Sequence, residues 1–423
     1  MTTVLPAPEA VRSINEIGIG LLRQPSMVLF GPGQRRQIPR VVAGVARRVL
    51  MVTDARMSAS PEFAQITETL AEQGISVLVY DGTEPDLPRR NVVDIAQRFS
   101  DSAVEAVVGI GGGSCMDLAK VASVVLTHGG DVRDYYGQFL VPGPGIPVVT
   151  VPTTGGTGAE VTCISVIFDE DQGMKVGVAS PHLEAYAAII DPELTLTCPP
   201  GLTAASGADA LSHLIESFTG RAKNPDTGQL ATTLYAGKNV LADVYARTGL
   251  ALLNRSLPAV AADPADLPAR SDTLFGAYCA GMAINTAGTA GAHAIQSPIG
   301  ALTHTPHGFG ISALLPYVMR YNLPARLPEF AEIGRILGVA RETDTEERQA
   351  QSAISRIEDI LQTLGAPIDL RTLGLQPGDF EYVAKQAMLA TRLTANNPRE
   401  LTVDSVQAIL RRGYDDDRSW WQL

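Results

Sequence analysis

The chain has 423 residues, which is enough for two domains with large hydrophobic cores. Hydrophobic residues make up 45% of the sequence and charged residues 18%, a balance that is ordinary for a soluble enzyme. The formal net charge of −12 argues against a nucleic-acid partner, which needs a basic face, and lends no support to an anionic membrane partner.

No segment of the sequence predicts secretion or membrane insertion. There is no run of about 18 apolar residues, as a membrane span needs, and no apolar segment after a basic start in residues 1–18. The four cysteines, Cys115, Cys163, Cys198 and Cys279, have no CxxC spacing. This pattern suits a reducing compartment without a disulfide framework, so we expect a cytoplasmic protein.

The first half of the chain alternates between strand and helix patterns. After a short helical or irregular lead-in at residues 1–24, apolar runs predict strands at residues 27–30, 47–52, 75–80, 106–110, 146–151 and 187–190. Apolar residues at helical spacing predict helices at residues 61–73, 91–100 and 116–128. This alternation predicts βαβ units around a parallel sheet. The segment TLTCPP at residues 195–200 breaks the pattern, and we place a domain boundary near residue 199.

A glycine-rich loop follows the fourth predicted strand. Gly111, Gly112, Gly113 and Ser114 separate that strand from the next predicted helix. Glycine lets the backbone come close to a ligand, and the free N–H groups at a helix start favour negative charge. The loop therefore predicts a phosphate site, although Ser114 stands where the fingerprint GxGxxG has its third glycine. An ordinary tight turn is the alternative.

Two other segments end predicted strands at the same edge of the sheet, where ligands bind to open parallel sheets. Asp54 follows the second strand, and a carboxylate there can accept hydrogen bonds from a ribose and repel a 2′-phosphate. A helix N-cap is the alternative role for Asp54. The segment PTTGGTG at residues 152–158 follows the fifth strand, and its composition suits contact with a cofactor or a plain turn.

The second half of the chain predicts an α-helical domain over residues 200–423, after an α/β domain over residues 1–199. Apolar residues at helical spacing predict helices at residues 204–219, 225–246, 269–292, 311–322, 327–338, 346–364, 379–388 and 402–413. The chain ends in its only two tryptophans, Trp420 and Trp421. We expect them to dock on the helical domain rather than on a neighbouring subunit.

Four side chains of this second half form a candidate metal site. Asp209 and His213 stand four residues apart on a predicted helix, so they lie on one face, one turn apart. His293 ends or lies within another helix, and His307 follows after the helix breakers at residues 298–306, which let the chain turn back. One carboxylate and three imidazoles suit a borderline divalent ion with a position left open for substrate. Unrelated core or surface residues are the alternative.

These motifs together resemble the iron-containing (group III) alcohol dehydrogenases over nearly the whole chain. GGGSCMDLAK at residues 111–120 is similar to the family's GGGSxxDxAK, PTTGGTGAE at 152–160 to its TTxGTGSE, and GTEPD at 82–86 to its EPN segment. GADALSHLIES at 207–217 and PHGFGISALLPYVMRYN at 306–322 match its two metal-site motifs. The resemblance implies a Rossmann-like N-terminal domain, a helical C-terminal domain and an active site in the cleft between them.

The resemblance also implies the chemistry and the residues that carry it. It implies a metal-dependent NAD(H) oxidoreductase that interconverts an alcohol and an aldehyde or ketone by hydride transfer. The divalent ion, Fe²⁺ in the first place and Zn²⁺ as the alternative, is held by Asp209, His213, His293 and His307. The implied cofactor contacts are Asp54, Gly111, Gly112, Gly113, Ser114, Asp117, Thr153, Thr154, Thr157, Lys175 and Leu194. Asp54 matches a position where an acid goes with preference for NAD over NADP.

One departure from the family pattern concerns the proton path. The stretch HAIQSPIG at residues 293–300 has Ser297 where members commonly carry the second histidine of HxxxHPLG. That histidine is thought to line the substrate pocket and to help move the proton. Without that histidine, the candidates for moving the proton are a cofactor ribose hydroxyl, water or His304. We favour a route through water and the ribose. A solvent-exposed position without a catalytic role explains His304 equally well.

Other functions remain open at this point. Maleylacetate reductase and hydroxyacid–oxoacid transhydrogenase differ from the leading interpretation in substrate, which the sequence does not reveal. A lyase resembling dehydroquinate synthase shares the two-domain plan but needs many basic side chains, whereas the residues around the histidines are mostly small and apolar. A non-catalytic nucleotide-binding protein would not need four converging ligands. By analogy with the family we expect a small alcohol or aldehyde as the ligand and a homo-oligomer.

Overall fold

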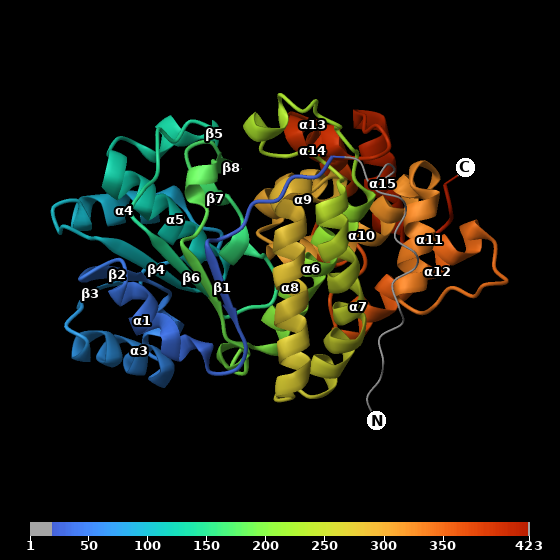
Figure 1. Ribbon diagram of the computed structural model, residues 1–423. Helices are drawn as coiled ribbons and strands as arrows, with labels where there is room; N and C mark the ends of the chain where they lie inside the picture. Colours follow the sequence, from blue (N-terminus) through green and yellow to red (C-terminus); the bar gives the residue numbers. More distant parts are fainter. Residues whose placement is uncertain (1–18, 422–423) are drawn as a thin grey trace.

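The computed structural model describes residues 19–421, and Figure 1 shows a part with a β-sheet beside a bundle of helices. The predicted lead-in lies outside the described residues up to position 18, and residues 19–25 have no regular secondary structure. The described strands lie between Met27 and Ile190, and long helices fill the chain from Pro200 onward. The fold is an α/β N-terminal domain followed by a helical C-terminal domain, as the sequence predicts.

Six parallel strands form the main sheet, in the order β1-β9-β6-β4-β2-β3. Their bounds are Met27–Phe30 (β1), Arg48–Val52 (β2), Ser76–Tyr80 (β3), Ala106–Gly111 (β4), Val148–Pro152 (β6) and Ala187–Ile190 (β9). All six predicted strands are thus confirmed, with small shifts at their ends. The inner strands β4 and β6 are buried along their whole length because helices cover both faces of the sheet.

Helices lie on both sides of this sheet (Figure 1). Apolar residues of α1 (Ile38–Ala43) and α3 (Pro61–Glu72) pack on one face, together with Met57 of the short helix α2 (Ala55–Ser58). Those of α4 (Arg89–Phe99) and α5 (Gly113–His128) pack on the other face. The three predicted helices correspond to α3, α4 and α5, and α5 begins earlier than predicted, within the glycine loop.

A small second sheet escaped the sequence analysis. Its strands are β5 (Gly137–Gln138), β7 (Ile164–Asp169) and β8 (Met174–Ala179), in the order β5-β8-β7. In β7 the usual burial of apolar residues is reversed: Ser165 is fully buried and Val166 is 39% exposed. The Ser165 hydroxyl donates to the carbonyl oxygen of Asp117 in α5 (3.0 Å), which compensates its burial. A hydrophobic pattern cannot reveal a strand of this kind.

The second domain contains ten α-helices among the described residues. Their bounds are Pro200–Thr219 (α6), Val240–Ala262 (α7), Leu267–Ala287 (α8), Gly291–Thr303 (α9), His307–Asn322 (α10), Leu327–Ile336 (α11), Glu346–Thr363 (α12), Phe380–Leu389 (α13), Thr391–Asn396 (α14) and Val403–Asp415 (α15). Seven of the eight predicted helices are present with shifted ends. The short helix α14 and the separate helix α9 were not predicted.

The helix predicted at residues 225–246 is wrong in its first two thirds. That stretch contains the 3₁₀ turn Leu230–Thr232 and an isolated β-bridge from Gly237 to Ala222, and α7 begins at Val240. Asn239 sets this start, because its side chain accepts a hydrogen bond from the N–H of Ala242 (3.2 Å). Apolar residues of the stretch, such as Tyr235, are buried in contacts between segments rather than along one helix face.

The predicted helix at residues 269–292 is two helices, and the expected turn lies elsewhere. Gly288, with φ +77°, ends α8, and α9 starts three residues later. Pro298 does not break the chain but lies inside α9. The chain turns instead at His304, which has φ 54°. Pro298 is the eighth of the 13 residues of α9, so the helix continues through a proline although this residue has no N–H to donate to the preceding turn.

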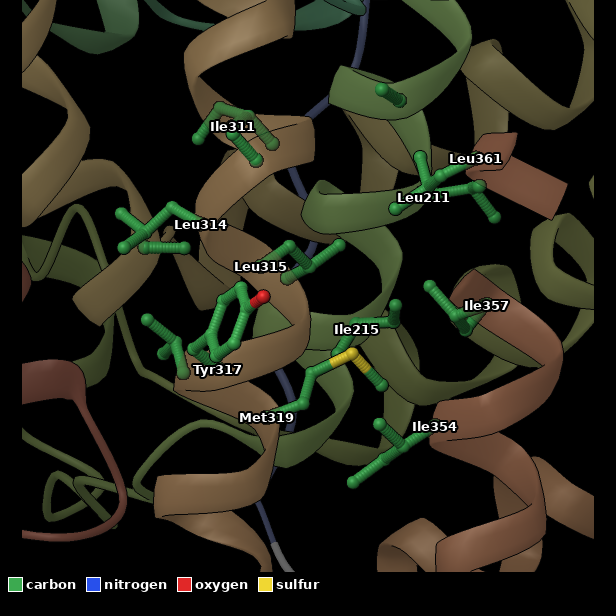
Figure 2. Close-up of a cluster of buried hydrophobic side chains, with 14 of the residues drawn as sticks. Leu211, Ile215, Ile311, Leu314, Leu315, Tyr317, Met319, Ile354, Ile357 and Leu361 are labelled. Atoms are coloured by element: carbon green, nitrogen blue, oxygen red, sulfur yellow. The ribbon is translucent and has the colours of Figure 1, made fainter. Parts of the chain in front are cut away.

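Packing of α6, α10 and α12 forms the core of the helical domain (Figure 2). Leu211 and Ile215 of α6 face Leu315 and Met319 of α10, and Ile357 of α12 adds to the same cluster. α6 is buried over most of its length. Because α6 carries Asp209 and His213 and α10 begins at His307, the packing that holds these two helices together also sets the distance between those side chains.

The C-terminal tryptophans pack against the helical domain, as the sequence predicts. The ring centroid of Trp421 lies 5.2 Å from that of Tyr321, edge to face, and the guanidinium of Arg412 lies 3.9 Å from the Trp421 ring centroid. The guanidinium of Arg320 lies 4.9 Å from the Trp420 ring. Within residues 19–421, no helix has the length and apolar character needed to cross a membrane.

Candidate active site

A cleft of about 830 Å³ runs between the two domains. One wall consists of the segments that follow β2, β4 and β6, and the other of residues from α6, α9, α10 and residues 382–393. The chain runs outward from β2 to β3 and returns on the other side of β2 to form β4. This reversal of strand order opens a crevice at the carboxyl ends of the strands, where ligands of open parallel sheets bind.

Asp209, His213, His293 and His307 meet in the wall of this cleft. Asp209 Oδ1 lies 3.4 Å from His213 Nε2, 3.5 Å from His293 Nε2 and 3.4 Å from His307 Nε2. The Nε2 atoms of His213 and His293 are 3.1 Å apart. Asp209, His213 and His293 are buried, and the His307 side chain is 30% exposed. The four residues that the sequence singles out as metal ligands are therefore side by side in space.

The polar atoms of this cluster fit a divalent metal. Asp209 Oδ1 is buried and has no hydrogen-bond partner, although three ring nitrogens surround it. A buried carboxylate oxygen without a partner costs about 1–3 kcal/mol or more. A cation shared with the neighbouring Nε2 atoms removes that cost. One carboxylate oxygen and three imidazole nitrogens are also a donor set that Zn²⁺ and Fe²⁺ accept.

The protonation states of His213 and Asp209 suit the same interpretation. Burial lowers the pKa of His213 to about 4, so its ring is neutral at neutral pH and its nitrogen can bind a metal. Burial favours a raised pKa for Asp209, but the nearby charges of His213 and His307 outweigh it and hold the pKa well below its usual value. Burial also lowers the pKa of His293, yet the carboxylates of Glu216 and Asp209 outweigh that effect and raise it to about 9, so a metal that binds this ring must displace a proton.

Glu216 of α6 builds the start of α9. Its carboxylate accepts hydrogen bonds from the N–H groups of Ala290 (2.8 Å) and Ala292 (2.6 Å) and from His293 Nδ1 (2.7 Å). It therefore satisfies N–H groups at the helix start and keeps the Nδ1 proton of His293, which leaves Nε2 as the atom that faces Asp209. Sequence analysis missed Glu216, although it follows His213 by three residues on the face that Asp209 and His213 share.

A close contact between helices brings His307 to Asp209. A Cβ atom on Gly308 would lie 1.9 Å from the carbonyl oxygen of Ala205 in α6. Only glycine permits this approach, so the residue after His307 lets the start of α10 lie directly against α6. His307 is thus placed by backbone packing, whereas His293 is placed by a side-chain hydrogen bond.

The glycine loop and the threonine segment form the opposite wall. α5 begins with Gly112 at its N-cap and has no side-chain cap, so its first N–H groups, at Gly113 and Ser114, suit an anion. Thr153, Thr154 and Thr157 line the cleft beside them. A Cβ on Gly113 would lie 2.7 Å from the Thr157 methyl group, so the two segments leave no room for a larger residue.

Asp54 lines the cleft and also caps a helix. Its Oδ1 accepts a hydrogen bond from the N–H of Met57 (2.9 Å) as the N-cap of α2. The alternative role considered for Asp54 is therefore present, and the residue still lies in the cleft wall at the end of β2. The two roles are compatible, because a carboxylate has a second oxygen.

Asp117 and Lys175 line the cleft as well, each with a partner inside the protein. Asp117 accepts hydrogen bonds from Lys120 Nζ (3.2 Å) and from the N–H of Val166 (2.9 Å). Lys175 Nζ lies 2.6 Å from Asp86 Oδ1. These pairs tie α5 and the second sheet to the loop after β3, so both residues have a structural role beside any contact with a ligand.

Three predicted site residues do not line the cleft. Gly111 lies beneath the loop, where φ of +151° and a would-be Cβ only 2.5 Å from Cys115 Sγ require glycine. Leu194 is buried in the hydrophobic cluster under the sheet. His304 is exposed at the end of α9. Ser297, in contrast, lines the cleft on α9, one turn after His293.

Sequence analysis also missed lining residues on the helical side. Tyr235, Asn285 and Arg392 all line the cleft. Tyr235 was assigned to the part of a predicted helix that is not helical, and Arg392 belongs to the unpredicted helix α14. No motif in the sequence marks these residues, because contacts between distant segments bring them to the cleft.

Comparisons with known proteins show the family to which the chain belongs. Two family models match: "Iron-containing alcohol dehydrogenase" over residues 25–192 and "Fe-containing alcohol dehydrogenase family, C-terminal" over residues 203–414. The chain is 32% identical to alcohol dehydrogenase 4 of Saccharomyces cerevisiae, over 92% of this chain and 97% of the relative. It is 32% identical to the NAD-dependent methanol dehydrogenase of Bacillus methanolicus, over 86% and 92%. A crystal structure of 1,3-propanediol oxidoreductase superposes with a TM-score of 0.87 at 30% identity, over 94% of this chain and 100% of that one.

Proposed function

Because the chain belongs to the family of iron-containing alcohol dehydrogenases, it is an oxidoreductase that interconverts alcohols and aldehydes or ketones, and we propose which of its residues carry this reaction. Asp209, His213, His293 and His307 hold a divalent metal. The observation that supports this assignment best is the unpartnered, buried Oδ1 of Asp209 among three imidazole nitrogens.

The wall formed by the α/β domain binds NAD. The first N–H groups of α5, at Gly113 and Ser114, face the pyrophosphate, and the threonines after β6 lie beside it. Asp54 at the end of β2 accepts hydrogen bonds from the adenosine ribose and repels the 2′-phosphate of NADP, which favours NAD. Leu194, which is buried away from the cleft, supports this wall from beneath.

When bound, the metal polarises the substrate oxygen as a Lewis acid and NAD carries the hydride. The side chains of the protein orient and balance this chemistry. Asp209 supplies the one negative charge among the ligands, and Glu216 fixes the ring of His293 through Nδ1. The donor set suits Fe²⁺ and Zn²⁺ alike, and we propose Fe²⁺ because the family is named for iron.

The proton leaves or enters by a route through water and the cofactor ribose. His304 is exposed at the far end of α9 and does not line the cleft. Ser297 lines the cleft on the same helix as His293, and its Oγ can hold a water molecule there by donating or accepting a hydrogen bond. A hydroxyl cannot act as a base at neutral pH, so Ser297 orients this water without taking the proton.

Metal analysis and NADH absorbance with a panel of alcohols, hydroxy acids and aldehydes test the proposal. The Asp209→Ala and His293→Ala variants should lose both the metal and turnover. The His182→Ala variant, which changes an exposed histidine in the 3₁₀ turn Pro181–Leu183, should keep both. Full hydride transfer in the metal-free variants would refute the assigned role of the metal.

The same assay separates the alternatives. A dehydroquinate synthase-like lyase uses NAD only transiently, so it gives no lasting change in NADH absorbance. A maleylacetate reductase or a hydroxyacid–oxoacid transhydrogenase is recognised by its substrate within the panel.

We also propose a homo-oligomer that resides in the cytoplasm. The first part rests on analogy with the family. The second is supported by the four cysteines, all of which are buried and free. Light scattering on the purified protein measures the oligomeric state, and cell fractionation the location.

A further inference from the structure

The helical wall of the cleft carries one charged side chain besides the metal-binding cluster. This side chain is Arg392 of α14. The other lining residues on this side are neutral, among them Tyr235, Thr289, Ser297 and Leu389. The acidic lining residues Asp54, Glu84, Asp86 and Asp117 all belong to the α/β wall. The part of the cleft near Arg392 therefore carries a positive charge that no lining carboxylate of the same wall balances, other than Asp209 in the metal cluster.

Two contacts hold α14 against the turn that precedes α9. Asn396 Nδ2 donates to the carbonyl oxygens of Ala287 (3.1 Å) and Thr289 (3.0 Å), and Asn396 is buried. Arg392 stands four residues earlier, on the same face of α14. A Cβ atom on Gly288 would lie 3.6 Å from the Arg392 guanidinium nitrogen Nη1. Arg392 is thus placed beside the turn that leads directly to His293.

Tyr235 holds the guanidinium in a defined position. The Arg392 guanidinium lies 4.7 Å from the centroid of the Tyr235 ring, a cation–π distance. Burial raises the pKa of Tyr235 well above its usual value, so the ring is neutral and does not serve as a counter-ion. A guanidinium held over a ring keeps its planar set of N–H donors free at its edge, which is the geometry that binds an oxyanion through two hydrogen bonds.

Arg392 lacks the carboxylate partner that comparable residues have. Lys175 in the cleft wall is paired with Asp86, and Lys120 behind it with Asp117. Across residues 19–421, neither Arg392 nor its neighbour Lys223 forms an ion pair. Burial, together with the positive charge of Arg392, lowers the pKa of Lys223. An anion that enters the cleft would supply the missing negative charge.

We propose that Arg392 binds an oxyanion group of the substrate, a carboxylate or sulfonate, while the substrate's hydroxyl or carbonyl group lies at the metal cluster. The preferred substrate is then an anionic alcohol or aldehyde of the hydroxy-acid class rather than a neutral alcohol. This inference depends on the function proposed above. Arg392 acts as a specificity-determining residue and takes no part in hydride transfer.

The kinetic test compares substrates that differ only in charge. ω-Hydroxy acids of three to six carbons are measured against the alkanols of the same length, with the wild type, Arg392→Ala and Arg392→Lys. For the best hydroxy acid, Arg392→Ala should raise KM about 10- to 100-fold, as expected when a hydrogen-bonded charge partner is lost. Its kcat/KM for the matched alkanol should stay within about twofold of the wild type. Arg392→Lys should recover part of the loss. The Arg348→Ala variant, whose wild-type side chain is 76% exposed on α12, is the matched control.

A binding measurement gives a result that does not depend on turnover. Calorimetry on protein loaded with metal and NAD compares linear carboxylates of two to six carbons with their neutral amides. The inference requires tighter binding of a carboxylate than of its amide, and loss of that difference in Arg392→Ala. Carboxylate binding that is unchanged in Arg392→Ala would show that the metal alone binds the anion, and the inference would be wrong.

Two further outcomes are distinguishable. The oxyanion could belong to the cofactor, so NAD is titrated by fluorescence into the wild type and Arg392→Ala. A loss of NAD affinity equal to the loss for hydroxy acids would assign Arg392 to the cofactor and overturn the inference. If alkanols are oxidised in a metal-dependent way while no acid is preferred, the proposed function stands and this inference falls. If no substrate of the panel reacts, the proposed function falls, and the calorimetry still decides the role of Arg392.

Discussion

Replacing Glu216 by glutamine should weaken metal binding without any change in a metal ligand. The carboxylate has two oxygens that accept three hydrogen bonds, from Ala290, Ala292 and His293. In Glu216→Gln one oxygen becomes an NH₂ group, so at least one of these donors faces another donor. An unsatisfied buried N–H costs about 1–3 kcal/mol, and this should appear as lost stability of the metal-free protein.

Metal affinity should fall by more than general destabilisation explains. Glu216 holds the proton of His293 on Nδ1, and loss of such a partner behind a metal-binding histidine costs about 10- to 100-fold in affinity. Competition with a chromophoric chelator measures this affinity, and urea denaturation of the metal-free protein measures stability. The two values are compared for the same preparations.

Ile354→Val provides a control with similar destabilisation. Ile354 lies in the core of the helical domain (Figure 2) and does not line the cleft, and loss of one buried methylene costs about 0.5–1.5 kcal/mol. This variant should unfold more easily and bind metal as the wild type does. If Ile354→Val loses as much metal affinity as Glu216→Gln, or if Glu216→Gln loses none, the role assigned to Glu216 is wrong.

Two other predictions concern backbone packing and a buried acid. Gly308→Ala places a Cβ 1.9 Å from the Ala205 carbonyl oxygen, so α10 must move away from α6. We expect a stability loss of about 1–3 kcal/mol and weaker metal binding. In the control variant Gly201→Ala the new Cβ meets no atom within 4 Å, so stability and metal binding should stay as in the wild type. Burial raises the pKa of Glu160 from 4.5 to about 7, so between these values the native state holds more protons than the unfolded state and stability falls as pH rises. Glu160→Gln should remove that loss. By urea denaturation the variant should be more stable than the wild type at pH 8, by up to about 3 kcal/mol, and should show no such gain near pH 4.5. An equal difference in stability at both pH values would contradict this explanation.

Features that depend on neighbouring residues were predictable from the sequence. The strands of the main sheet are short apolar runs bounded by turns, and all six are present. The glycine loop could be located because its backbone geometry requires glycine at Gly111, where a side chain would meet Cys115. Asp209 and His213 could be paired because helix geometry alone puts residues four apart on one face.

Features that depend on contacts between distant segments were missed or wrong. Residues 225–239 have helix-compatible composition, but they lie in an irregular segment in which Tyr235 is buried against other segments. Helix α9 was not predicted because Pro298 reads as a helix breaker. The residue that stabilises the start of this helix, Glu216, precedes it by more than 70 positions, so no local pattern reveals it. Strand β7 was hidden by the buried Ser165, which is satisfied by a carbonyl group of α5.

The two walls of the cleft differ in how far their residues can be recognised from the sequence. The nucleotide wall and the metal cluster are built from motifs that stay recognisable in sequence, since each motif carries its own geometry. The wall near Arg392 is assembled from the segment of Tyr235, the turn at Gly288 and helix α14, and hydrogen bonds from Asn396 hold the last two together. A change in any one of these segments alters the charge or shape that meets the substrate, while the proposed metal and NAD sites remain intact. Substrate preference can therefore differ between members that share every motif, and it must be inferred from the assembled cleft rather than from the family.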